Sequence, residues 1–129
     1  MLRACRSALK PGGRIAFSTI YIADELPADV RWRIGRGLPA GVYSRVDHER
    51  LLRSARFANV ERRDVSDEFL RIQRSYHESF QRHERALRRA LGDSIYDERQ
   101  TGRERSIKGL EAGALKRAIL SAERPPARR

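Results

Sequence analysis

Hydroxyl and aromatic side chains follow an apolar, β-favouring run near the start of the sequence. Ligands of open α/β sheets bind at the carboxyl ends of strands, and Ser18, Thr19 and Tyr21 are placed where such a strand would present them. The rings of Trp32 and Tyr43 come next and could stack on the same ligand. These groups can bind and orient a substrate, but no catalytic residue is identified among them. In the competing interpretation, Ser18 and Thr19 are ordinary strand residues and Trp32 anchors the core.

Histidine and glycine patterns elsewhere do not form a recognised site. His77 and His83 are six residues apart, a poor spacing for a shared metal site on a helix, and no further ligands accompany them, so we predict no bound metal. The segment Gly35–Gly41 is not a dinucleotide-binding turn, because Ala40 occupies the position of its third glycine. We interpret this segment as a surface loop that can act as a lid.

Three strands are expected to position the candidate binding residues. Pro11 ends a preceding helix because proline lacks the N–H group, and Gly12 and Gly13 supply the backbone freedom of a tight turn. The run that follows is apolar on both faces, which is typical of an interior strand of a sheet covered by helices. The sequence therefore predicts an α/β fold with strands at about residues 13–22, 57–65 and 117–124.

Short helices are expected before the first and second of these strands. Residues 1–10 have apolar positions on one side of a helix. Asp47 is a good N-cap for a helix that runs through about Ala55, because its carboxylate can accept hydrogen bonds from the first turn. Leu51 and Leu52 give that helix its apolar face.

Two longer helices are expected between the second and third strands. Ser66 begins the longest predicted helix, which ends at Gly92. Its apolar positions recur at helical spacing and predict one face, formed by Phe69, Ile72, Tyr76, Phe80, Leu87 and Leu91. We expect this face to pack into the core rather than to line a substrate cavity. A capping box at Thr101 predicts a last helix that runs to about Arg117.

Composition limits the class of protein. The chain has 129 residues, of which 40% are hydrophobic and 35% charged, enough for one domain with a modest core. The formal net charge is +11, and the basic excess sits at the two ends, so a solvated arginine-rich surface is favoured over nucleic-acid binding. The single cysteine, Cys5, excludes an internal disulfide and favours a reducing compartment. No apolar run is long enough to span a membrane, and we predict a cytoplasmic protein.

Three segments resemble class I S-adenosylmethionine-dependent methyltransferases. Residues 9–17 (LKPGGRIAF) are similar to the turn into the fifth strand of that family, residues 51–60 (LLRSARFANV) to the helix before its sixth strand, and residues 113–125 (GALKRAILSAERP) to its closing strand. The family's sheet order is 3-2-1-4-5-7-6, with strand seven antiparallel. One departure is Arg56, which stands where the family has a glycine, at a helix end that favours the left-handed conformation.

The resemblance implies a Rossmann-like sheet of which this chain contains only the C-terminal half, strands five to seven, in residues 1–125. A disordered basic tail is expected at residues 126–129. The family binds its cofactor, S-adenosylmethionine, through a glycine-rich turn after the first strand and an acid at the end of the second. Neither feature lies upstream of Leu9, since only eight residues precede it.

We therefore expect a truncated methyltransferase that contributes substrate-side residues and is inactive as an isolated chain. It is either a fragment or one half of an assembly in which a partner chain supplies the rest of the sheet. The alternative is a basic, non-enzymatic module that docks on nucleic acid or on a partner methyltransferase. No residue points to a particular methyl acceptor.

Overall fold

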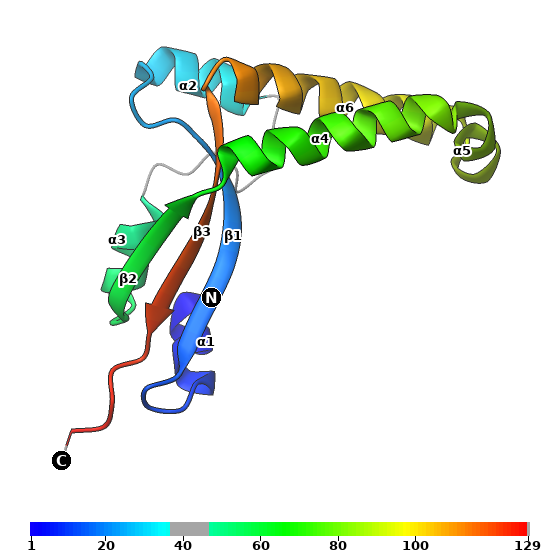
Figure 1. Ribbon diagram of the computed structural model, residues 1–129. Coiled ribbons are helices and arrows are strands. Elements are labelled where there is room, and N and C mark those ends of the chain that lie inside the picture. Colours follow the sequence, from blue (N-terminus) through cyan, green and yellow to red (C-terminus); the bar gives the residue numbers. More distant parts are fainter. Residues whose placement is uncertain (37–46, 129) are drawn as a thin grey trace. The chain divides into compact units, whose positions relative to one another are not determined.

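The computed structural model describes residues 1–36 and 47–128. Its contacts divide the chain into two compact units (Figure 1). The sheet unit comprises Met1–Val65 with Arg117–Arg129, and the helical unit comprises Ser66–Lys116. Among the helices of the described ranges, none has the length and apolar character needed to cross a membrane.

The sheet unit begins with the predicted helix, turn and strand. Helix α1 (Leu2–Ala8) ends before the proline, and strand β1 (Arg14–Ile22) begins after the two glycines. Gly12 has a φ of +77°, a conformation that favours glycine. The N–H of Gly13 donates to the Lys10 carbonyl oxygen at 2.8 Å, and a Cβ on Gly13 would lie 2.8 Å from that same oxygen. Both glycines are therefore required by the turn itself.

The three strands have the order β1-β3-β2, with β2 at Ala58–Asp64 and β3 at Leu115–Glu123. Strands β2 and β3 are antiparallel, with Arg62 opposite Leu120, and Figure 1 shows that β3 also runs opposite to β1. The predicted order five-seven-six is confirmed, and each strand lies close to its predicted bounds. Within the described residues β1 is an edge strand, although its apolar character is typical of an interior one. Helix α2 (Ala28–Gly35) follows β1 and contacts it.

One face of the sheet carries the core of the sheet unit. Helix α3 (His48–Ser54) packs on it, and the predicted N-cap is confirmed, because the Asp47 carboxylate accepts the N–H of Glu49 at 2.9 Å. Leu52 of α3 and Leu120 of β3 are 0% and 1% exposed. The buried cluster consists of Leu52, Ala55, Phe57, Ala118, Leu120 and Ala122, with Leu2 and Leu9 packed against it.

Two residues between α3 and the body of β2 have positive φ angles, 65° for Arg56 and 50° for Asn59. Arg56 adopts the left-handed conformation that the resemblance assigns to a glycine, at a cost of about 1–2 kcal/mol for an ordinary residue. Asparagine tolerates this conformation better. Asn59 lies at an irregularity in the pairing of β2 with β3, where its amide donates to the Glu123 carboxylate at 2.9 Å.

The helical unit contains α4 (Ser66–Arg82), α5 (Glu84–Leu91) and α6 (Asp93–Glu111), and Figure 1 shows α4 and α6 side by side. The prediction of one continuous helix from Ser66 to Gly92 is wrong, because the helix breaks at His83, where φ is −109°. The apolar repeat is interrupted there, since the residues at positions 83 and 84 that would continue the face are polar. The predicted end at Gly92 is confirmed, with a φ of +89°.

The predicted start of the last helix is also wrong. Helix α6 begins at Asp93, and Thr101 lies inside it, so the capping-box pattern does not mark an end. The buried positions of α6 are Tyr96, Gln100 and Leu110, which fall on one helical face. Because this buried face includes the polar Gln100, the spacing of apolar residues did not indicate where the helix begins. Helix α6 ends before the predicted limit, as the chain enters β3.

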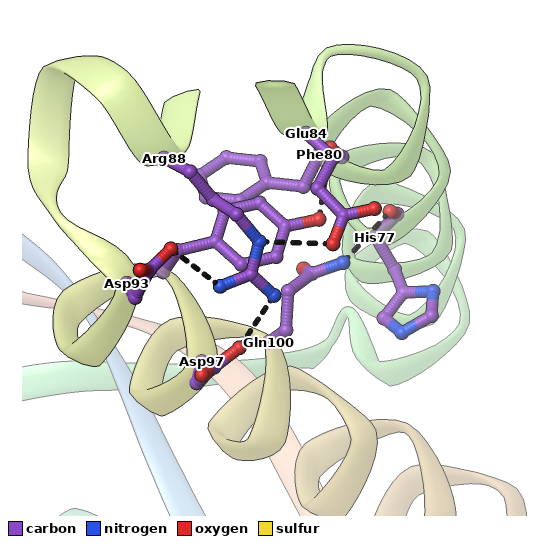
Figure 2. A network of polar contacts seen from close by, with 8 residues as sticks. His77, Phe80, Glu84, Arg88, Asp93, Asp97 and Gln100 are labelled. Atoms are coloured by element: carbon purple, nitrogen blue, oxygen red, sulfur yellow. Dashed lines mark hydrogen bonds and ion pairs between the residues drawn. The ribbon is translucent and has the colours of Figure 1, made fainter. Parts of the chain in front are cut away.

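A cluster of ion pairs around Arg88 joins α5 to the start of α6 (Figure 2). The guanidinium lies 2.9 Å from Glu84, 3.0 Å from Asp93 and 2.7 Å from Asp97. It also lies 4.3 Å from the ring centroid of Tyr96. Hydrogen bonds to the three carboxylates, that to Asp97 above all, raise the pKa of Arg88 above its ordinary value. One arginine on α5 thus holds two carboxylates of the first turns of α6.

Candidate functional site

Thr19 and His48 meet on one face of β1. Thr19 Oγ1 lies 3.3 Å from His48 Nε2 in a partly buried contact, and the ring centroids of Phe17 and His48 are 6.4 Å apart. An imidazole can act as a general acid or base toward a group that it contacts. The sequence analysis did not single out His48. Its spacing could have identified it, because His48 lies four residues before the buried Leu52 and so shares the sheet-facing side of α3.

A cavity of about 680 Å³ opens beside this pair within the sheet unit. Its volume falls in the usual range for small-molecule sites. It is bounded by α1, β1 and α3, and its lining residues are Met1, Leu2, Arg3, Phe17, Ser18, Thr19, His48, Leu51, Ser54 and Ala55. The Thr19–His48 pair therefore lies in the wall of a cavity large enough for a substrate.

Ser18 and Thr19 point to opposite sides of β1, because successive residues of a strand alternate. Ser18 is exposed, and its Oγ accepts a hydrogen bond from Arg117 Nη2 at 3.2 Å. Tyr21, two residues beyond Thr19, shares the face of Thr19. The structure thus brings Thr19 and Tyr21 to one side with His48, while Ser18 contributes only to the rim of the larger cavity.

Tyr21 packs against Arg62 of β2, whose guanidinium carbon lies 4.4 Å from the ring centroid. Partial burial lowers the pKa of Arg62, but the contact with the Tyr21 hydroxyl and the carboxylates of Glu49 and Asp47 outweigh it, so the net shift is upward. Arg62 therefore stays cationic. A cavity of about 20 Å³ lies among Thr19, Tyr21 and Arg62, with room for about one water molecule.

Trp32 lies on α2 with 52% of its surface exposed, and the Arg36 guanidinium carbon lies 4.8 Å from its ring centroid. The interpretation of Trp32 as a core anchor is therefore wrong. Tyr43 lies outside the described residues. The predicted surface loop Gly35–Gly41 does so as well, apart from its first two residues.

The apolar face of α4 does not pack fully into a core. Ile72 and Tyr76 are 48% and 55% exposed, contrary to the expected core packing of this face. Together with Phe80 and Leu87 they line a groove of about 670 Å³ within the helical unit. The polar side chains that line the same groove are Glu68, Arg71, Ser75, Ser79 and His83. The groove therefore offers apolar rings and hydrogen-bonding groups together.

Arg103 of α6 packs against two of the groove's aromatic rings. Its guanidinium carbon lies 3.7 Å from the ring centroid of Phe80 and 5.5 Å from that of Tyr76. Burial and then the positive charge of Arg99 lower the pKa of Arg103, which nevertheless remains cationic because arginine does not deprotonate in proteins. Its Nη1 donates to Gln100 Oε1 at 2.9 Å.

Metal ligands do not gather in the described parts of the chain. No group of three or more histidine, cysteine, aspartate or glutamate side chains there is placed to hold a metal ion. His77 instead lies 3.2 Å from the Glu104 carboxylate, and its carbonyl accepts the amide of Gln100 at 3.2 Å. His77 therefore joins α4 to α6.

No protein-family model and no curated protein matches the sequence. Solved structures are similar in fold. Phosphoethanolamine N-methyltransferase 2 from Haemonchus contortus has a TM-score of 0.78 at 15% identity and covers 96% of this chain. A proposed sarcosine dimethylglycine methyltransferase from Galdieria sulphuraria has 0.78 at 14% identity over 98%. A cyclopropane synthase from Mycobacterium tuberculosis has 0.75 at 12% identity over 95%.

The H. contortus enzyme has been solved with S-adenosyl-L-methionine and with S-adenosylhomocysteine. The described residues of this chain do not fit that cofactor as the family holds it. A glycine-rich turn must follow a strand to let the backbone approach the cofactor closely. None of the three strands is followed by such a turn in the described ranges, and Gly12 and Gly13 precede β1 and serve its turn.

This chain spans 29%, 47% and 48% of the lengths of these three solved proteins. Its sheet has the strand order and the antiparallel closing strand that the resemblance in sequence implies. The chain has the fold of part of a class I S-adenosylmethionine-dependent methyltransferase.

Proposed function

We propose that this chain is the substrate-side part of an S-adenosylmethionine-dependent methyltransferase. The observation that carries the proposal is the fold, because nearly the whole chain superposes on part of a solved methyltransferase with a TM-score of 0.78. In this proposal the cofactor is held by a further half of the sheet. That half belongs either to the same protein or to a partner chain.

The free edge of β1 supports this role. Its backbone groups on the outer side have no strand partner within the described residues, and unpaired edges of apolar strands promote association. Strand β1 also carries apolar side chains on both faces, including Phe17 and Ile20. Pairing with a fourth strand would make β1 interior and satisfy both features.

The substrate contacts that we propose are Ser18, Thr19, Tyr21, Trp32 and Tyr43, and we add His48 because it contacts Thr19. Methyl transfer depends on holding the acceptor atom in line with the methyl group. A neutral imidazole at His48, oriented by the Thr19 hydroxyl, can receive a proton from a nitrogen or oxygen acceptor. The walls of the 680 Å³ cavity would hold the rest of the substrate.

Isothermal titration with S-adenosylmethionine tests the division of roles. We expect no saturable binding by this chain alone, because none of its described strands is followed by the cofactor turn and the remaining contacts must overcome the entropy of association unaided. We expect micromolar binding and methyl transfer when the chain is joined to a cofactor-binding half encoded in frame upstream, or mixed with a partner that supplies it. Saturable micromolar binding by the chain alone would contradict the proposal.

The substrate-side role has its own test in the complete enzyme. His48→Asn should lower kcat by about 10²–10⁴-fold, the range of a general acid–base contribution, Thr19→Val should lower it in the same direction, and both should leave the affinity for S-adenosylmethionine unchanged. His83→Asn is a matched control, because His83 lies in the helical unit. An unchanged kcat in both sheet-unit variants would remove this pair from the substrate site.

A further inference from the structure

A second cavity of the sheet unit lies at the opposite end of α3 from His48. It has a volume of about 290 Å³, the lower end of the range for small-molecule sites. Its described lining holds three guanidinium groups, two hydroxyl groups and no carboxylate, from Arg3, Arg6, Ser7, Ser54, Ala55 and Arg56. This composition suits a small anion rather than an apolar ligand.

The three arginines are not neutralised by the protein. Among the ion pairs of residues 1–36 and 47–128, none includes Arg3, Arg6 or Arg56. The neighbouring Arg53 of α3, by contrast, is paired with Glu49 at 3.4 Å. Like charges that share one hollow repel each other and create a positive potential there, which an anion would relieve.

Hydrogen bonds from Arg6 and Arg124 hold the cavity wall in place. Arg6 Nε donates to the Arg56 carbonyl oxygen at 3.2 Å, which fixes the guanidinium of Arg6 and leaves its terminal amino groups for a ligand. Arg124 Nη1 donates to carbonyl oxygens at the end of α1, those of Arg6, Ser7 and Leu9. This cation offsets the negative end of α1, which would otherwise repel an anion.

The backbone of Arg56 is strained. It has a φ of 65°, in the left-handed region where glycine is favoured, yet the chain places a long cationic side chain there. Arg56 lines the cavity together with Arg3 and Arg6 of α1. A residue that is unfavourable for the backbone is thus present where its charge meets two others.

We propose that this cavity binds a phosphate group, either free phosphate or the phosphate of a small monoester. Arginine guanidinium groups match the geometry of tetrahedral phosphate oxygens and form charge-assisted hydrogen bonds with them. Ser54 adds a hydroxyl group at the same wall, whereas the Ser7 hydroxyl donates to the Arg3 carbonyl oxygen at 3.1 Å. The cavity shares Arg3, Ser54 and Ala55 with the lining of the 680 Å³ cavity, but neither Thr19 nor His48 lines it, and phosphate binding does not require the proposed transferase role.

Isothermal titration of the chain with inorganic phosphate at low ionic strength tests the site, with glycerol 3-phosphate as a second arm. We expect saturable binding at one site per chain. Arg56→Gly and Arg3→Gln should each weaken it about tenfold, the effect of losing one charge-assisted hydrogen bond. Tighter binding of the ester than of free phosphate would identify a phosphorylated small molecule as the natural ligand.

Arg50→Gln is the matched control, because Arg50 is an exposed arginine on α3, the helix that contributes Ser54 to the cavity, and is itself outside the cavity lining. It removes the same charge and should change the affinity less than twofold. Arg56→Gly relieves the backbone, so a loss of binding in that variant does not reflect unfolding, and circular dichroism verifies this. Absence of saturation, a stoichiometry well above one, or equal weakening by Arg50→Gln would overturn the proposal.

Discussion

The Thr19 hydroxyl and the His48 imidazole are 29 residues apart in the sequence and 3.3 Å apart in space. Thr19 is held by β1, whereas His48 is held by a helix that the Asp47 carboxylate caps and that Leu52 anchors to the sheet. Two independently stabilised elements therefore set this distance. Such support is what a site needs if it is to hold a reacting group in one geometry.

Thr19→Val should lower the free energy of unfolding by about 1 kcal/mol, because it removes a partly buried hydrogen bond and keeps the shape of the side chain. Urea unfolding measures the difference. Thr101→Val is the control, since Thr101 is exposed on α6 and the same change there should stay within about 0.5 kcal/mol. Equal effects at the two positions would show that the contact with His48 contributes nothing to stability.

Leu52→Ala should destabilise the chain by about 2–5 kcal/mol, because Leu52 is 0% exposed and its loss leaves a cavity in the core. The adjacent Leu51 is 36% exposed and lines the larger cavity instead. Leu51→Ala should therefore cost less than about 1 kcal/mol. If thermal unfolding ranks the two variants in the opposite order, α3 packs on the sheet through a different face.

Arg88→Gln should destabilise the helical unit, because it leaves Glu84, Asp93 and Asp97 without their shared cation. The difference from the wild type should shrink in 1 M salt, since exposed charges are screened. Arg89→Gln is the control, as Arg89 is exposed and forms no ion pair among the described residues. A salt-independent difference would assign the effect to packing on Tyr96.

The same variant tests how the stabilisation by Arg88 depends on pH. The pKa of Arg88 is raised in the folded state, so its stabilisation is fully present below the unfolded pKa and is lost only as the pH rises through the folded pKa. Both values lie above the pH range in which the protein would be studied. The wild type should therefore keep its advantage over Arg88→Gln between about pH 6 and pH 9, measured by denaturant unfolding at each pH.

Arg56→Gly should stabilise the chain by about 1 kcal/mol, because glycine adopts a φ of 65° without the steric cost that arginine has. The greater freedom of glycine in the unfolded chain offsets part of this gain. Arg56→Ala keeps the steric cost and removes the charge, so it separates the two effects. A stabilisation of the same size in both variants would trace the gain to relieved charge repulsion with Arg3 and Arg6.

The sheet was predictable because its signals are local and strong. Proline and two glycines fix the turn into β1, and apolar residues mark β1 and β3. The helical unit was less predictable, because its packing uses polar residues. Gln100 is buried on α6 through a hydrogen bond to the His77 carbonyl, and periodicity cannot reveal such a position. The candidate site was predicted only in part, because α3 places His48 beside Thr19 and no sequence pattern around Thr19 indicates this contact.

The strand order has a consequence for how the chain folds during synthesis. Strand β3 lies between β1 and β2 although it is made last of the three, and it supplies Ala118, Leu120 and Ala122 to the core. Until residues 115–123 leave the ribosome, β1 and β2 have neither a strand between them nor a filled core. The helical segment emerges first and can form from local contacts. A nascent chain arrested before Leu115 would therefore present the apolar strand β1 without a partner strand, which makes it a target for chaperones and for aggregation.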